Sequence, residues 1–153
     1  MKKVILLLAL LLFTISGLID LSYAKKVRPP VADKDEIKGM AKRDFETIVV
    51  LWKDEDYERL YEYGRLSSHT KVSKEAFSKR MKNKRWKLMC CGDGAKEIEA
   101  IYKSPASVYI KAIMGYKSVV KEMKRHDTFK LTFEDGKWKI DLSQVLRVPK
   151  GER

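Results

Sequence analysis

The clearest pattern in the chain is an alternation of hydrophobic and polar residues between positions 128 and 143, interrupted by Asp135-Gly136. Gly tolerates the positive φ angle that a two-residue type I′ turn requires, so this pattern predicts a β-hairpin. With Glu134 opposite Lys137, one face collects six hydrophobic side chains, in the pairs Phe133 with Trp138, Leu131 with Ile140 and Phe129 with Leu142. The other face pairs opposite charges, Glu134 with Lys137 and Lys130 with Asp141. A shift of one residue would destroy both patterns, so the register is expected to be fixed.

Hydrophobic residues at helical spacing predict helices in the first half of the chain. Asp33 followed by Glu36 is typical of a capping box, and hydrophobic positions recur from Ile37 to Trp52. A shorter helix, capped by Asp54 or Asp56, is expected to end at Gly64. A polar connection over 66–72 then leads to Ser73, which is expected to cap a third helix.

From residue 86 the hydrophobic period changes from 3.6 to 2, which predicts strands. Ile98, Ala100 and Tyr102 alternate with polar neighbours, and the longest alternation turns Val108, Ile110, Ala112, Met114 and Tyr116 inward. The segment 118–125 fits either a continued strand or a helical turn. We therefore expect an α+β fold, with three N-terminal helices packed on a curved antiparallel sheet of about four to six strands.

The N-terminal residues have the pattern of a targeting segment. A basic start, a hydrophobic run from Val4 to Phe13 and small residues at Ser22 and Ala24 predict a cleaved signal peptide over 1–24. A retained membrane anchor is the alternative, although the hydrophobic run is shorter than a bilayer span. The remaining chain divides into a basic extended leader (25–33), a single domain (34–148) and a tail (149–153), expected in the periplasm or outside the cell.

Charge and cysteine content narrow the choice of partners. The net charge of +12 favours anionic surfaces or ligands, unless it only keeps the protein soluble. The densest cationic cluster is Lys79, Arg80, Lys82, Lys84, Arg85 and Lys87, which predicts a patch for anionic lipid or envelope polymer, or else cations that favour a helix C-terminus. Cys90 and Cys91 are adjacent, too close for an ordinary disulfide, so one buried and one outward thiol are expected, with intermolecular bridging as the alternative.

The chain resembles the nuclear transport factor two-like superfamily, a cone-shaped α+β fold. The resemblance lies in the end of the first helix (51–57), the start of the third (73–77) and the closing hairpin (134–140). It implies a pocket between the helices and the concave face of the sheet. This superfamily includes enzymes, ligand-binding proteins and scaffolds, so the resemblance alone does not identify an activity.

The pocket implied by this resemblance would be lined mainly by aromatic residues. The candidates are Trp52, Tyr57, Tyr61, Tyr102, Met114, Tyr116, Phe133 and Trp138, which at these spacings are also ordinary core residues. Enzymes of the superfamily typically use a pocket Asp assisted by Tyr. Asp127 shares the inward parity of Phe129, so it is the candidate general base, with Tyr102 or Tyr116 as helper, unless it caps a turn or pairs with a lysine.

Three functions follow from these observations. The leading one is an exported, non-enzymatic domain that binds a small apolar ligand or a protein partner through the pocket or the sheet face. The alternatives are an isomerase, dehydratase or hydrolase with Asp127 as base, and a basic adaptor at an anionic cell envelope. No cofactor or metal site is expected, and nucleic acid is not expected as a partner. Outward Tyr109, Ile113 and Ile101 leave room for a homodimer.

Overall fold

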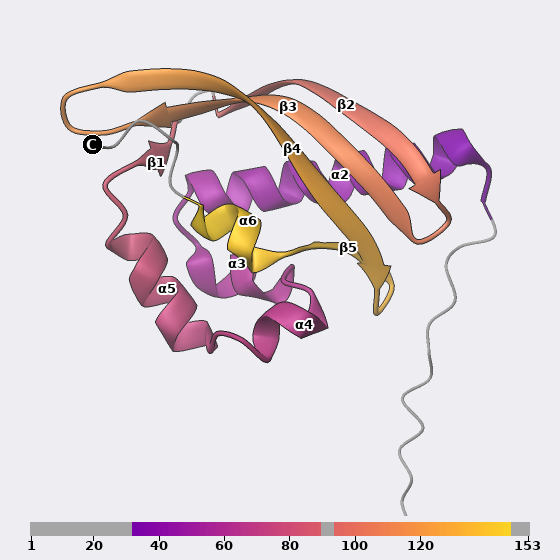
Figure 1. Cartoon of the computed structure of the whole chain (residues 1–153), viewed down its shortest axis with the longest axis horizontal. Helices are drawn as coiled ribbons and strands as arrows, with labels where there is room; N and C mark the ends of the chain where they lie inside the picture. The colour runs from indigo at the N-terminus through magenta and orange to yellow at the C-terminus, as the bar shows by residue number, and fades with distance from the viewer. Residues whose placement is uncertain (1–31, 90–93, 148–153) are drawn as a thin grey trace, which may run out of the picture.

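The structure, a computed structural model, describes residues 32–89 and 94–147. Its elements in chain order are α2 (Lys34–Lys53), α3 (Tyr57–Glu62), α4 (Leu66–His69), α5 (Lys74–Lys82), β1 (Lys87–Leu88), β2 (Ala95–Ser104), β3 (Ser107–Lys117), β4 (Glu122–Glu134), β5 (Lys137–Ile140) and α6 (Leu142–Leu146) (Figure 1). The predicted α+β class is confirmed, with helices followed by a curled antiparallel sheet. The predicted signal peptide, most of the leader, both cysteines and the tail lie outside the described residues.

Helix α2 begins where the sequence predicted it. The Asp33 carboxylate accepts hydrogen bonds of 2.8 Å from the backbone N–H groups of Asp35 and Glu36, which have no partner inside the helix. One face of the helix is buried, through Ile37, Ala41, Phe45, Ile48, Leu51 and Trp52. That face lies under the curled sheet and contacts β1, β2, β3 and β5 (Figure 1). The hydrophobic core therefore lies between α2 and the sheet.

Helix α3 packs beside α2, and α5 packs against α3. Asp56 caps α3 and Ser73 caps α5, as the sequence predicted. One difference is the single turn α4, which lies in the segment expected to be a polar connection. It forms because Glu134, the last residue of β4, accepts hydrogen bonds from the Leu66 N–H at 2.9 Å and the Arg65 side chain at 3.0 Å. The capping group is therefore a residue 68 positions away, which local sequence reasoning does not reveal.

The sheet has five antiparallel strands within the described residues. Its order is β2-β3-β4-β5, and the two-residue β1 pairs with the far end of β3. The predicted inward face is confirmed, because Val108, Ile110, Ala112, Met114 and Tyr116 are at most 4% exposed. In β2, a bulge at Glu97, whose φ angle is positive at 49°, shifts the register with β3 between Lys96 and Glu99.

The closing hairpin confirms the predicted turn and most of its register. Asp135 and Gly136 both have positive φ angles, 53° and 79°, as a type I′ turn requires. The pairs Glu134 with Lys137, Phe133 with Trp138 and Leu131 with Ile140 form as predicted. The two pairs beyond Ile140, Phe129 with Leu142 and Lys130 with Asp141, were wrong. The strand stops there because Asp141 caps α6 by accepting from the Ser143 N–H at 2.9 Å.

The ambiguous segment 118–125 is neither a helical turn nor one continuous strand. Ser118 and Lys121 close a turn, with the Ser118 N–H donating to the Lys121 carbonyl at 2.8 Å. Strand β4 then starts at Glu122 and pairs with β3 from Lys117 back to Ser107. β3 and β4 therefore make a long hairpin that extends past the helices at one end of the molecule (Figure 1).

Candidate functional site

The residues predicted to line a pocket lie in or against the hydrophobic core. Trp52, Tyr57, Met114, Tyr116 and Trp138 are at most 5% exposed, and Tyr61, Tyr102 and Phe133 are half-buried. Several of them contact one another: the Trp52 and Tyr116 rings are 6.3 Å apart, and the Phe133 and Trp138 rings are 5.5 Å apart. The first contact joins α2 to β3 and the second joins β4 to β5, and a ligand-binding role for the same side chains stays a prediction.

Asp127, the candidate base, lies beside a tyrosine as the catalytic hypothesis requires. The Tyr116 hydroxyl donates to Asp127 Oδ2 at 2.8 Å, and Arg125 Nη2 lies 2.7 Å from Oδ1. The Asp127 side chain is 15% exposed. Burial raises the pKa of Tyr116, and the charge of Asp127 and its hydrogen bond raise it further. The tyrosine therefore stays a neutral donor to the Asp127 carboxylate.

A cavity of about 360 Å³ adjoins Asp127 at the edge of β4. It is lined by Arg125, His126, Asp127, Thr128, Phe129, Gln144 and Arg147. Gln144 Oε1 accepts from the Lys130 N–H at 3.1 Å and so takes the place of a further strand at that edge. Because Tyr116 and Arg125 already donate to both carboxylate oxygens, Asp127 suits a structural ion pair better than the removal of a substrate proton.

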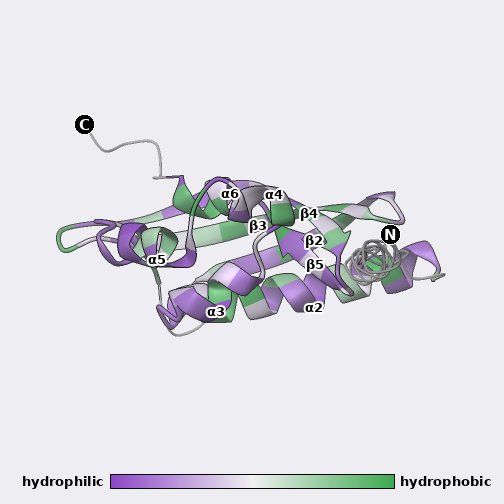
Figure 2. Ribbon diagram, turned by 90° about the horizontal axis from the view of Figure 1, so that it is seen from below, coloured by the Kyte–Doolittle hydropathy of each residue, from purple (hydrophilic) through white to green (hydrophobic). Residues whose placement is uncertain are grey.

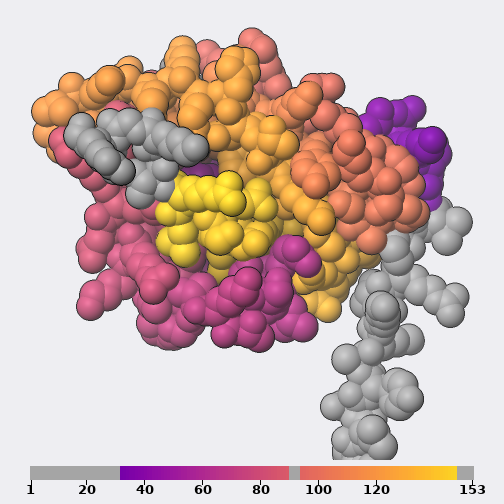
Figure 3. Space-filling model, in the orientation of Figure 1, coloured from indigo at the N-terminus to yellow at the C-terminus, as the bar shows by residue number. Residues whose placement is uncertain are grey.

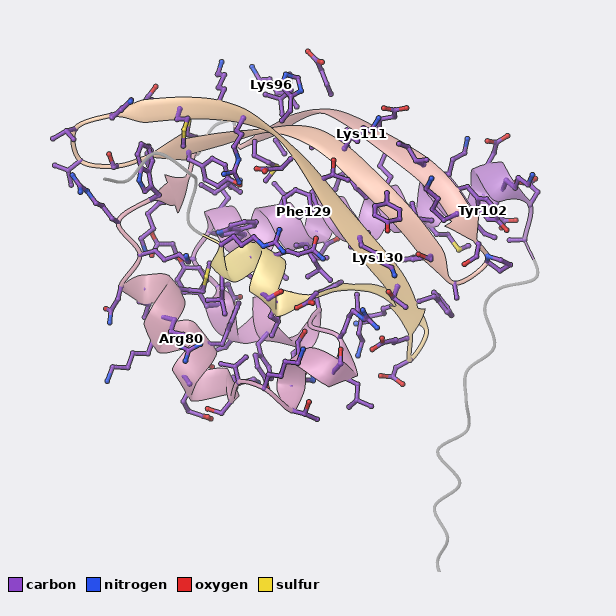
Figure 4. The ribbon with its side chains drawn as sticks, in the orientation of Figure 1. Arg80, Lys96, Tyr102, Lys111, Phe129 and Lys130 are labelled. Carbon is purple, nitrogen blue, oxygen red and sulfur yellow. The ribbon has the colours of Figure 1, made fainter. Side chains whose placement is uncertain are left out.

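The cationic cluster predicted on and after α5 divides into two groups. Lys79, Arg80, Lys82 and Arg85 are exposed, and Figure 4 shows Arg80 on α5. Lys84 and Lys87 are half-buried and bind backbone oxygens: Lys84 Nζ donates to the Leu146 carbonyl at 2.6 Å, and Lys87 Nζ to the Lys82 carbonyl at 3.0 Å. Lys87 also pairs with Glu55 at 3.0 Å. Four of the six cations therefore face solvent.

The outer face of the sheet has a hollow that sequence reasoning missed. Its volume is about 670 Å³, and it is lined by Ile101, Lys103, Ser104, Ser107, Tyr109, Lys111, Thr128 and Lys130. These residues come together through the register of three strands, in which Ile101 and Lys130 lie on either side of Tyr109, and Thr128 lies opposite Lys111. In Figure 4, Lys96 and Lys111 lie on the side of the sheet away from α2, whereas Phe129 lies on the helix side. We call this hollow the outer sheet site.

The outer sheet site is positively charged. It contains three lysines, and Lys103 Nζ lies 5.7 Å from the centre of the Tyr109 ring. Glu99 is the nearest carboxylate by register, since it pairs with Lys111 across β2 and β3. Within residues 32–89 and 94–147, no ion pair of 4.0 Å or less joins Lys103, Lys111 or Lys130 to a carboxylate. The alternation in the sequence predicts that Tyr109 and Lys111 point outward, but it does not predict which residues of β2 and β4 lie beside them.

Among the described residues, no three His, Cys, Asp or Glu side chains gather closely enough to hold a metal ion. None of the helices in that part is both long and apolar enough to cross a membrane.

Comparisons with known proteins identify no family for this chain. No protein-family model matches it, and no curated protein matches it significantly. The resemblance to the nuclear transport factor two-like superfamily therefore stays a prediction.

Proposed function

We propose that this protein is a non-catalytic binding protein whose outer sheet site holds an anionic polymer. The observation that carries the proposal is the hollow of about 670 Å³ in which Lys103, Lys111 and Lys130 surround Tyr109. The ammonium groups are donors without acceptor capacity, so this surface favours anionic ligands.

The remaining lining residues indicate a ligand that also carries hydroxyl groups. Ser104, Ser107 and Thr128 offer hydroxyl groups that both donate and accept hydrogen bonds. Tyr109 adds an aromatic surface with a polar end. An acidic polysaccharide has the matching groups, which are carboxylate or sulfate charges, hydroxyls and the apolar faces of sugar rings.

The predicted location agrees with such a ligand. If residues 1–24 direct export, acidic envelope or extracellular polysaccharides are accessible to the mature protein. The curled sheet that follows the helices is also consistent with the proposed superfamily, which includes non-catalytic members. The sheet face is then the binding surface, and the aromatic residues beneath it form its support.

Catalysis at Asp127 is the second candidate, favoured by its hydrogen bond with Tyr116 beside a cavity. We rank it lower because Arg125 and Tyr116 occupy the two carboxylate oxygens. A substrate-dependent activity lost in D127N but retained in K111E/K130E would reverse this order.

Calorimetric titration of the full-length protein with heparin tests the proposal. The K111E/K130E variant should weaken binding at least about tenfold, because two attractive contacts become repulsive. K79E/R80E on α5 is the matched control, since it changes the net charge equally, and it should remain within about threefold of the unsubstituted protein.

Y109A separates recognition of sugar rings from charge attraction, because it leaves the charge unchanged. It should weaken heparin binding without altering the salt dependence. Absence of heparin binding, or equal losses in the two charge-reversal pairs, would refute the proposal. Tighter binding of single-stranded DNA at equal salt would replace polysaccharide with nucleic acid as the ligand.

A further inference from the structure

The turn between β3 and β4 exposes two neighbouring hydrophobic side chains. Val119 is 99% exposed and Val120 is 79% exposed. Among the described residues, the other large hydrophobic side chains classed as exposed are Leu66 at 67% and Val50 at 47%. Figure 2 shows the turn as a hydrophobic tip at the end of the hairpin, beyond the helices.

The conformation of this tip is defined by Ser118 and Lys121. The Ser118 N–H donates to the Lys121 carbonyl at 2.8 Å, and the Lys121 N–H donates to Ser118 Oγ at 3.2 Å. Both valines therefore occupy the central positions of a closed turn. Gly, Asn, Asp, Pro and Ser are the residues that favour such positions, whereas Val favours strands. A preference for forming the turn therefore does not explain why valine occupies both central positions.

Basic residues accompany the tip. Lys121 and Lys124 are exposed next to it, and the carboxylate in this stretch, Glu122, lies opposite Lys117. Helix α5, with Lys79, Arg80 and Lys82 exposed, lies at the same end of the molecule in Figures 1 and 2. The space-filling view shows the hairpin projecting at the upper left, above α5 (Figure 3). One end of the protein thus combines an exposed hydrophobic tip with exposed basic side chains around it.

We propose that the Val119-Val120 tip inserts into the interfacial region of an anionic lipid bilayer. Hydrophobic side chains leave water for the acyl boundary, while adjacent lysines contact the lipid phosphates, and neither attraction alone gives firm binding. Charge complementarity selects anionic lipid over a neutral surface. This inference does not rest on the outer sheet site, because the two sites use different residues.

A local fluorescence readout tests insertion directly. V120W is introduced into the full-length protein and mixed with vesicles of phosphatidylcholine, with or without phosphatidylglycerol. We expect a blue shift of the added emission, and quenching by brominated acyl chains, with the anionic vesicles. L66W is the matched control, because it places the same probe at an exposed hydrophobic position on α4, and it should not respond.

Vesicle partitioning provides the second measurement. V119S/V120S should bind anionic vesicles at least about tenfold more weakly than L66S, because two hydrophobic side chains no longer enter the bilayer. All variants carry the same N-terminal segment, so their differences report the tip. An unresponsive V120W, an equal response of L66W, or equal partitioning of the serine variants would overturn the proposal.

Discussion

The Tyr116 hydroxyl on β3 donates a 2.8 Å hydrogen bond to Asp127 on β4, although the two residues are not opposite each other in the sheet. Tyr116 pairs with Met123, and Asp127 pairs with Ala112. The tyrosine ring therefore reaches along the inner face and passes Arg125, whose guanidinium carbon lies 5.5 Å from the ring centre. The three side chains form one polar cluster at the margin of a hydrophobic core.

This cluster is expected to stabilise the fold. D127N removes the ion pair and leaves the partly buried Arg125 without its anionic partner, so the free energy of unfolding should fall by about 2 kcal/mol. Y116F removes one hydrogen-bond donor and should cost about 1 kcal/mol. Urea denaturation of both variants and of the double variant measures these losses and their coupling. Losses that simply add would show that the three groups do not act as a unit.

The sequence predicted those parts of the fold that depend on neighbouring residues. The Asp135-Gly136 turn determines the register from Glu134 to Ile140, and Asp33 and Ser73 cap helices within a few residues of themselves. The end of the hairpin was not predicted, because Asp141 can either continue a strand or cap a helix. The Ser68 Oγ donates a hydrogen bond of 3.2 Å to the Asp141 carboxylate and favours the cap, but Ser68 is 73 residues earlier in the sequence.

The candidate site was less predictable for a related reason. Alternation showed that Tyr109 and Lys111 face outward, but the hollow also needs Lys103 from β2 and Lys130 from β4. The bulge at Glu97 changes the alignment of β2 with β3, and periodicity gives no position for such a bulge. Likewise, charge density grouped Lys87 with exposed cations, whereas its partner Glu55 is 32 residues earlier.

Lys87 is expected to contribute to stability rather than to surface binding. Its ammonium group lies within 3.2 Å of four oxygens, from Glu55, Tyr57, Met81 and Lys82. Burial lowers the pKa of Lys87, but the hydrogen bonds that its ammonium group donates to Glu55 and Tyr57 outweigh burial and raise the pKa overall. K87M should lower the free energy of unfolding by about 1–2 kcal/mol, because two carbonyls at the end of α5 lose their donor. K79M, on an exposed side chain, should remain within about 0.5 kcal/mol in the same thermal or urea denaturation.

Two glycine substitutions should have opposite effects. Gly136 has a φ of 79°, which a residue with a Cβ rarely adopts, so G136A should destabilise the protein by about 1 kcal/mol. Gly39 lies inside α2, where an added Cβ would meet only the end of Arg43 at 3.8 Å. G39A should therefore stabilise by about 0.5–1 kcal/mol, because Ala favours the helix. Denaturation midpoints measure both, and a stabilising G136A would contradict the type I′ turn.

Asp141 is expected to make stability depend on acid pH. Burial raises its pKa, but hydrogen bonds from Ser143 and Ser68 and the charge of Lys71 outweigh it and hold the pKa below the ordinary value of 3.8. In the unfolded chain the carboxyl takes up a proton near that ordinary value, whereas in the folded protein it does so only at lower pH. Its stabilisation is therefore complete above the unfolded pKa and is lost as the pH falls through the folded one.

D141N isolates this contribution. At neutral pH it should lower the free energy of unfolding by about 1 kcal/mol, because an amide is a weaker acceptor than a carboxylate for the α6 cap. The difference from the unsubstituted protein should shrink as the pH falls below 3.8 and should vanish below the lowered pKa of folded Asp141, where both proteins lack the charge. Urea denaturation at several pH values between neutrality and strong acid measures that difference. A gap that stays constant over this range would mean that Asp141 acts through its shape at the helix start rather than through its charge.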